Sequence, residues 1–128
     1  MSYGYFKNIS ADFDTVDEKI RQTLADNGFG VITEIDVKST FKTKLDADFQ
    51  PYKIIGACNP AIAYKALSEE PDVGLLLPCN VVVIDNLDGT IRVGAIDAEK
   101  MLTISGRDDL KMLADKVNSL LKIAIDAV

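Results

Sequence analysis

Residues 79–96, CNVVVIDNLDGTIRVGAI, decide the fold, because they contain two strand-like runs separated by a turn signal. The first run, at residues 81–84, is apolar and entirely β-branched, and the second covers residues 91–96. Asp88-Gly89, between the runs, is a dipeptide typical of tight hairpin turns. The sequence therefore predicts an antiparallel β-hairpin that turns near Asp88 and Gly89.

A long amphipathic helix is predicted after this hairpin, beyond a turn at residues 97–106. Its apolar residues recur at helical spacing and are Leu110, Leu113, Val117, Leu120, Leu121 and Ala124. Such a helix packs its apolar face on a sheet. A hairpin beside a closing helix favours an α+β fold, a two-layer sandwich with a largely antiparallel sheet and helices on one face. A doubly wound parallel sheet is the weaker alternative, because the hairpin requires an antiparallel pair.

The residues before the hairpin predict more strands and helices. Strands are expected at residues 3–9, 29–37 and 52–58, helices at about 15–27 and 60–70, and a short helical turn within 39–51. Thr15 and Glu18 have capping-box spacing. Asn59 is a favoured N-cap, and Pro60 is a favoured first helical residue. In the strand at 29–37, alternation places Phe29, Val31, Ile35 and Val37 on one face, and in the next segment Ser39 is a candidate cap with Phe41 and Leu45 facing inward.

Length and composition describe a globular chain. Its 128 residues fit a single domain spanning residues 1–128, with 48% hydrophobic and 27% charged residues. The net charge of −6 argues against nucleic acid and anionic membranes as partners. Because the sequence shows no signal-peptide layout and no long apolar run, the expected compartment is the cytoplasm, where thiols stay reduced. The absence of histidine excludes Ser-His-Asp and Cys-His triads and any imidazole metal site.

The two cysteines, Cys58 and Cys79, have similar settings, since each is followed by asparagine and lies close to a proline. Cys58 ends a predicted strand directly before the N-cap Asn59, where the helix dipole favours a thiolate or an anionic ligand. Gly56 allows a ligand to approach the backbone. Three interpretations remain open: buried structural thiols, a shared ligand or redox site, and a disulfide. A zinc site is disfavoured, because two thiols leave zinc two ligands short.

A basic cluster precedes the first cysteine. Its residues are Lys38, Lys42, Lys44 and Lys53, interleaved with Phe41, Phe49 and Tyr52. The functional interpretation is an anion-binding rim near Cys58, and the alternative is a solvated face with buried aromatics. Asp46 and Asp48 dilute the positive charge and make a nucleic-acid ligand unfavourable.

The segment YKIIGACNPAIAYKALSEEPDVGLLLPCNVVV, residues 52–83, resembles the DUF302 family, also called TT1751-like. The likeness lies in the Gly-Ala-Cys-Asn-Pro and Gly-Leu-Leu-Leu-Pro-Cys-Asn blocks, and FKTKL upstream and DGTIRVGAID downstream also fit. Many relatives have Asp-Pro where this chain has Asp97-Ala98. The resemblance implies a β-α-β(4)-α plan and a homodimer, and it supplies no catalytic residues. Its motif positions are Lys42, Lys44, Tyr52, Gly56, Cys58, Asn59, Pro60, Pro78, Cys79 and Asn80.

Three functions follow from these observations. The first is a homodimer that binds a small anionic ligand near the two Cys-Asn motifs, with Cys58, Asn59, Cys79, Asn80, Lys42, Lys44, Tyr52 and Gly56 as candidate binding residues. The second is a thiol-dependent enzyme or redox carrier. The third is a non-catalytic protein-interaction module. No cofactor or metal is expected, and the expected partners are a second copy of the chain and a small molecule.

Overall fold

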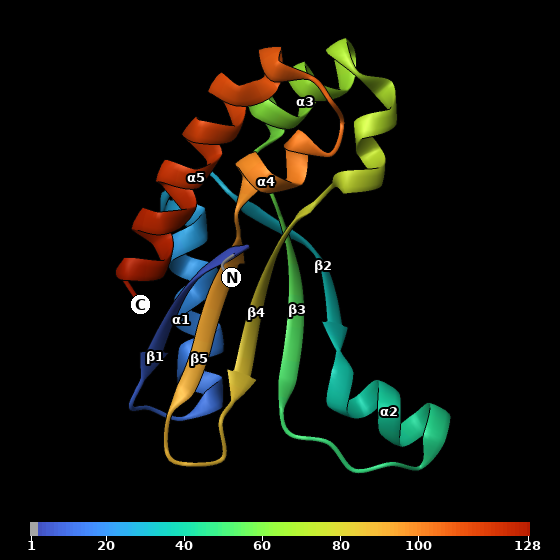
Figure 1. Cartoon of the computed structure of the whole chain (residues 1–128). Helices are drawn as coiled ribbons and strands as arrows, with labels where there is room; N and C mark the ends of the chain where they lie inside the picture. The colour runs from blue at the N-terminus through green and yellow to red at the C-terminus, as the bar shows by residue number, and fades with distance from the viewer. Residues whose placement is uncertain (1–2) are drawn as a thin grey trace.

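A five-stranded antiparallel sheet organises residues 3–128, which are the residues that the computed structural model describes (Figure 1). Its strands are β1 (Gly4–Ile9), β2 (Gly30–Asp36), β3 (Tyr52–Cys58), β4 (Cys79–Asp85) and β5 (Ile91–Ile96). They lie in the order β1-β5-β4-β3-β2, and every neighbouring pair is antiparallel. The predicted single domain starts at residue 1, and residues 1 and 2 lie outside the described range.

Helices cover one face of this sheet and also lie at both of its ends, with α3 and α4 at one end and α2 at the other (Figure 1). They are α1 (Phe13–Asp26), α2 (Val37–Leu45), α3 (Pro60–Glu69), α4 (Ala98–Thr103) and α5 (Lys111–Asp126), with 3-10 turns η1 (Pro71–Leu76) and η2 (Asp108–Leu110). α1 packs on β4 and β5, and α5 packs on β1 and β5 (Figure 1). The predicted α+β fold, with a largely antiparallel sheet and helices on one face, is confirmed.

The core lies between the sheet and helices α1 and α5. On the helix-covered face, Ile55, Val81 and Val83 have no exposed surface, and Ile20 of α1 and Ile125 of α5 are equally buried. Every second residue of a strand points to this face, which explains why β4 alternates between buried and less buried positions. None of the helices within residues 3–128 combines the length and apolarity that crossing a bilayer requires.

The predicted hairpin is confirmed, with a connection longer than a two-residue turn. β4 ends at Asp85 and β5 begins at Ile91. Leu87 and Gly89 both have positive φ, at 62° and 88°. The Thr90 amide donates to Asp88 Oδ1 at 2.9 Å, so this aspartate side chain closes the loop.

Helix starts differ from the predictions in two places. α1 begins at Phe13, and its N-cap is Asp12, whose carboxylate accepts from the Thr15 amide at 2.8 Å. The Thr15–Glu18 capping box is therefore wrong. α2 is capped in the same way, because the Asp36 side chain accepts from the Ser39 amide. Aspartate three residues before an amide is also a capping signal, and it takes precedence here over Thr15 and Ser39.

A β-bulge in β2 overturns the predicted alternation of that strand. The register shifts between Val31 and Thr33, so Val31 pairs with the buried Ala57 while Ile35 pairs with Ile54. A bulge adds one residue and moves the following side chains to the opposite face. Ile35 is accordingly 50% exposed rather than buried with Val31. The inward orientation predicted for Leu45 is also wrong, because its side chain is 70% exposed.

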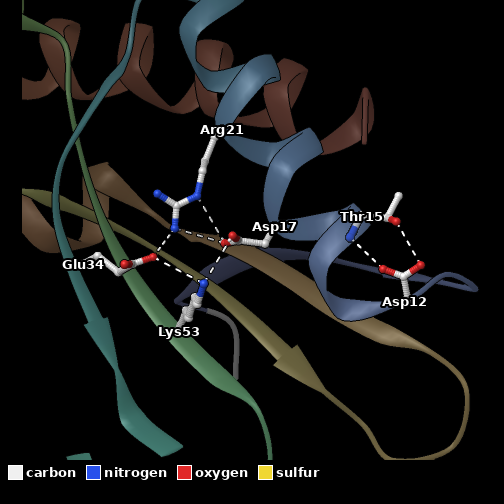
Figure 2. A network of polar contacts seen from close by, with 6 residues as sticks. All are labelled: Asp12, Thr15, Asp17, Arg21, Glu34 and Lys53. Atoms are coloured by element: carbon white, nitrogen blue, oxygen red, sulfur yellow. Dashed lines mark hydrogen bonds and ion pairs between the residues drawn. The ribbon is translucent and has the colours of Figure 1, made fainter. Parts of the chain in front are cut away.

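A network of four charged side chains connects α1 with β2 and β3 (Figure 2). Asp17 contacts Arg21 at 3.1 Å and Lys53 at 3.4 Å, and Glu34 contacts the same two cations. The bulge makes this network possible, because it turns Glu34 toward the helix-covered face. Lys53, assigned from the sequence to an anion-binding rim, is instead paired with carboxylates between α1 and the sheet.

Candidate functional site

The two Cys-Asn motifs meet at one end of the sheet. β3 ends at Cys58, and the next residue, Asn59, caps α3 by accepting from the Ile62 amide at 3.2 Å. β4 begins at Cys79, which pairs with Ala57 across the two strands. Cys58 is one residue further along β3, so its Cα atom lies about 6 Å from that of Cys79. The sequence could not show that β3 and β4 are neighbours, and the sheet order establishes it.

A cavity of about 270 Å³ adjoins both motifs. The sheet end supplies Ala57, Cys58 and Cys79, α3 supplies Ile62, Ala63, Ala66 and Leu67, α4 supplies Ala98, Met101 and Leu102, and α5 supplies Leu113 and Val117. Phe29, Ile32, Asn59, Leu77 and Pro78 complete the lining. Almost all of these side chains are apolar. The arrangement suits an apolar guest and has no charged group to bind an anion.

The two thiols differ in exposure and acidity. Both are free, and Cys79 is only 7% exposed whereas Cys58 is half-buried. Burial, with a smaller contribution from repulsion by Cys58, raises the pKa of the Cys79 thiol to about 11. Cys79 is therefore neutral at physiological pH and a poor nucleophile. Cys58 is the more accessible thiol beside the cavity.

Gly56 and Asn80 are paired across β3 and β4, but they point to the other face of the sheet. A Cβ atom at Gly56 would meet the Thr33 hydroxyl and lie 2.6 Å from Pro78 Cγ. Glycine at this position is therefore required by close packing of the sheet, and not by the approach of a ligand. Asn80 is exposed on that same face.

Lys42, Lys44 and Tyr52 lie at the opposite end of β3 from the cavity (Figure 1). Tyr52 and Cys58 are the first and last of the seven residues of extended β3, which places them about 20 Å apart. Lys42 pairs with Asp46 at 2.9 Å. The predicted lysine rim near Cys58 is wrong, because α2 is inserted at the far end of the strand.

Sequence reasoning assigned none of the cavity residues of α3, α4 and α5 to the site. Met101 and Leu102 line the cavity from α4, a helix of six residues in a segment predicted to be a turn. Asp97 caps this helix by accepting from the Glu99 and Lys100 amides. An aspartate followed by AEKMLT is a usable helix-start signal. The apolar face that α3 presents to the cavity could be predicted from the sequence, since Ile62, Ala63 and Ala66 recur at helical spacing.

Comparison with known proteins agrees with the resemblance seen in the sequence. Residues 5–128 match the family described as "Domain of unknown function DUF302". The chain belongs to the DUF302 family. Its fold is similar to the crystal structure of an uncharacterized conserved protein DUF302 from Bacillus stearothermophilus, with a TM-score of 0.91 and 27% sequence identity. That similarity covers 99% of this DUF302 chain and 98% of the other. No protein with a curated description matches the chain.

Proposed function

We propose that this DUF302 chain binds a small apolar molecule in the cavity beside Cys58 and Cys79. The observation that carries the proposal is the hollow itself, about 270 Å³ lined by apolar side chains. Protein interiors are close-packed, and an apolar hollow of this size is suited to a guest. A cavity of about 150 Å³ holds benzene, so this one has room for more than a single ring.

The ligand class in this proposal replaces the small anion expected from the sequence. The lysines assigned to an anion site lie at the far end of β3, and Asn59 is the one amide side chain in the lining. Asn59 Oδ1 already accepts from the Ile62 amide. Burial of apolar surface therefore supplies the binding free energy, at about 25 cal/mol per Å².

Filling the cavity tests this proposal. Ala63→Phe places a ring into the cavity from α3, and Ala61→Phe places the same ring on the exposed side of that helix. The wild-type chain is expected to bind the fluorescent probe N-phenyl-1-naphthylamine saturably at one site. Ala63→Phe should weaken that binding at least tenfold, while Ala61→Phe should not. Equal binding by the two folded variants contradicts the proposal.

The chain is also proposed to act as a homodimer that associates through the uncovered face of the sheet. This open face carries Phe6, Asn8, Thr33, Ile35, Tyr52, Ile54, Asn80, Val82, Ile84, Arg92 and Ile96. Antiparallel sheets that face water usually alternate apolar with polar residues, yet the open face is mostly apolar and Arg92 is its single charged member. Arg92 stacks on the Phe6 ring at 4.1 Å. A self-complementary apolar face of this kind suits a two-fold dimer.

A further inference from the structure

One side chain in the lining of the cavity, Asn59, carries strong hydrogen-bond donors. Its oxygen is already used, because Oδ1 accepts from the Ile62 amide at 3.2 Å and so caps α3. This bond also determines which end of the side-chain amide is the nitrogen, since only the oxygen can accept from an N–H group. The Nδ2 group, with its two N–H donors, has no hydrogen-bond partner within residues 3–128. The apolar cavity is therefore accompanied by one donor group that is free to bind a ligand.

The Asn59 amide lies where the cavity meets solvent. Asn59 is half-buried, whereas Phe29 and Ala66 of the same lining are only 2% and 4% exposed. Nδ2 lies beside Gly28, because a Cβ atom at Gly28 would be 3.2 Å from it. Gly28 has a positive φ of 86° and no side chain, so the space next to the amide nitrogen stays open.

We propose that the ligand of this cavity is a neutral, largely apolar molecule with one carbonyl group, whose oxygen accepts a hydrogen bond from Asn59 Nδ2. This inference rests on the proposed function, because it names the class of molecule that the same cavity takes. Small-molecule sites combine an apolar lining with a few polar groups that fix the orientation of the ligand. Asn59 has that role here, with the carbonyl end of the ligand at the rim and its apolar part inside.

The charges around the cavity favour a neutral carbonyl over a carboxylate. No Lys or Arg is among the described residues that line the cavity. Moving an ionised carboxylate from water into apolar surroundings without a cation costs far more than moving a neutral carbonyl group. The net charge of −6 on the chain also repels an anion. A ketone, aldehyde or ester oxygen satisfies Nδ2 without burying a charge.

The Asn59 amide determines selectivity, while burial of apolar surface supplies most of the affinity. In water, both Nδ2 and a carbonyl oxygen are hydrogen-bonded to solvent, so pairing them on binding changes the affinity only about two- to tenfold. An apolar ligand of the same shape without an acceptor displaces water from Nδ2 and leaves its N–H groups unpaired, which weakens binding.

Displacement of bound N-phenyl-1-naphthylamine by two compounds of equal shape tests the proposal. 2-Acetylnaphthalene has C=O where 2-isopropenylnaphthalene has C=CH₂, so only the first accepts a hydrogen bond. Asn59→Asp keeps the cap of α3, because aspartate caps a helix as well as asparagine does, and it replaces Nδ2 with an oxygen that does not donate. This substitution should raise the Kd of 2-acetylnaphthalene about five- to tenfold more than that of 2-isopropenylnaphthalene.

Asn80→Asp is the matched control, because it makes the same change in the other Cys-Asn motif, on the uncovered face of the sheet. Its Kd values for both compounds should equal those of the wild type. On the wild type, 2-naphthoate should displace the probe much less well than 2-acetylnaphthalene. The inference is overturned if Asn59→Asp weakens both neutral compounds equally, or if 2-naphthoate binds as tightly as the ketone.

Infrared spectroscopy of the wild type decides the question if Asn59→Asp does not fold. A hydrogen bond to a carbonyl oxygen weakens the C=O bond, so bound 2-acetylnaphthalene should absorb at a lower frequency than it does in hexane. A band at the hexane frequency shows that the oxygen accepts no hydrogen bond and overturns the inference.

The outcomes separate this inference from the proposed function. If both neutral compounds displace the probe and Asn59→Asp affects them alike, the cavity binds apolar molecules and only the role of Asn59 is rejected. If neither compound displaces the probe, the cavity is not the ligand site, and the proposed function is rejected together with this inference.

Discussion

At the scale of single residues, Cys58 and Cys79 should respond differently to an alkylating reagent. The thiolate is the reactive form of cysteine. Cys79 is 7% exposed and its pKa is raised to about 11, first by burial and then by repulsion from Cys58. With iodoacetamide at pH 8, we therefore expect Cys58 to be modified while Cys79 stays intact, as measured by peptide mass spectrometry.

Unfolding provides the control for this prediction, because in denaturant both thiols lose their surroundings and should react at similar rates. Cys58→Ser should leave the folded chain almost inert to the reagent. Comparable labelling of the two cysteines in the folded wild type contradicts the burial of Cys79. Such a result would also mean that the two thiols are equally accessible, which contradicts the expectation that Cys58 is the more reactive one.

At the scale of elements, α4 is held in place by reciprocal hydrogen bonds between its N-terminus and the Asn118 side chain of α5. Asp97 Oδ1 accepts from the Glu99 and Lys100 amides and from Asn118 Nδ2 at 2.9 Å. In return, Asn118 Oδ1 accepts from the Ala98 amide at 2.7 Å. These hydrogen bonds hold α4, and with it Met101, against the cavity. Without these hydrogen bonds to Asn118, a six-residue helix has few internal hydrogen bonds to stabilise it.

Replacing this cap should destabilise the chain. Asp97→Ala is expected to lower the free energy of unfolding by about 1–2 kcal/mol, the usual cost of losing an N-cap. Asp108→Ala, at an exposed position in η2, is the control and should change it by less than about 0.5 kcal/mol. Urea unfolding measures both. Equal midpoints for the two variants contradict the role given to Asp97.

The Asp97 carboxylate should also make the free energy of unfolding depend on pH. Burial alone would raise the pKa of Asp97, but hydrogen bonds from Asn118, Lys100 and Glu99 outweigh burial and lower it. Because the pKa of Asp97 is lower in the folded chain than in the unfolded chain, where it is about 3.9, the carboxylate stabilises the fold at pH values above 3.9. This stabilisation is lost as the pH falls through the folded-state pKa. The stability difference between wild type and Asp97→Asn should therefore shrink below about pH 4.

Elements with strong local signals could be predicted from the sequence. The hairpin followed from Asp88-Gly89, and α3 followed from Asn59, Pro60 and the helical spacing after them. α4 could not, because a six-residue helix has too little periodicity and depends on Asn118, twenty-one residues beyond Asp97. The β2 bulge was also hidden, since strict alternation predicts one face for Val31 and Ile35.

The candidate site also has one part that could be predicted from the sequence and one part that could not. Sequence similarity between the two Cys-Asn motifs indicated a shared location, and the strand order places them together. The apolar character of the cavity depends on α4 and α5, whose packing is a long-range property. The lysine rim failed for a related reason. Lys42 and Cys58 are close in sequence, but an extended strand carries them to opposite ends of the sheet.

At the scale of the whole molecule, the two faces of the sheet are unequal. α1 and α5 cover one face, whereas the open face carries mostly apolar side chains. Phe6 lies over Gly94 on that face, where a Cβ atom would clash with its ring. Exposed apolar patches on soluble chains mark sites of association, so a second copy is expected to cover this face.

A charge placed at the centre of the open face should prevent that association. Val82 lies on β4, between Ile54 and Gly94 on the neighbouring strands, and Val82→Lys would bury an ammonium group between two copies. Burying an unpaired charge costs several kcal/mol, enough to shift a micromolar dimer to monomer. Ile123→Lys, at a 54% exposed position on α5, adds the same charge to the helical side and should leave the dimer intact. Sedimentation equilibrium measures the mass of each variant. A wild-type chain that is monomeric at all concentrations, or a Val82→Lys variant that is still dimeric, contradicts association through the open face.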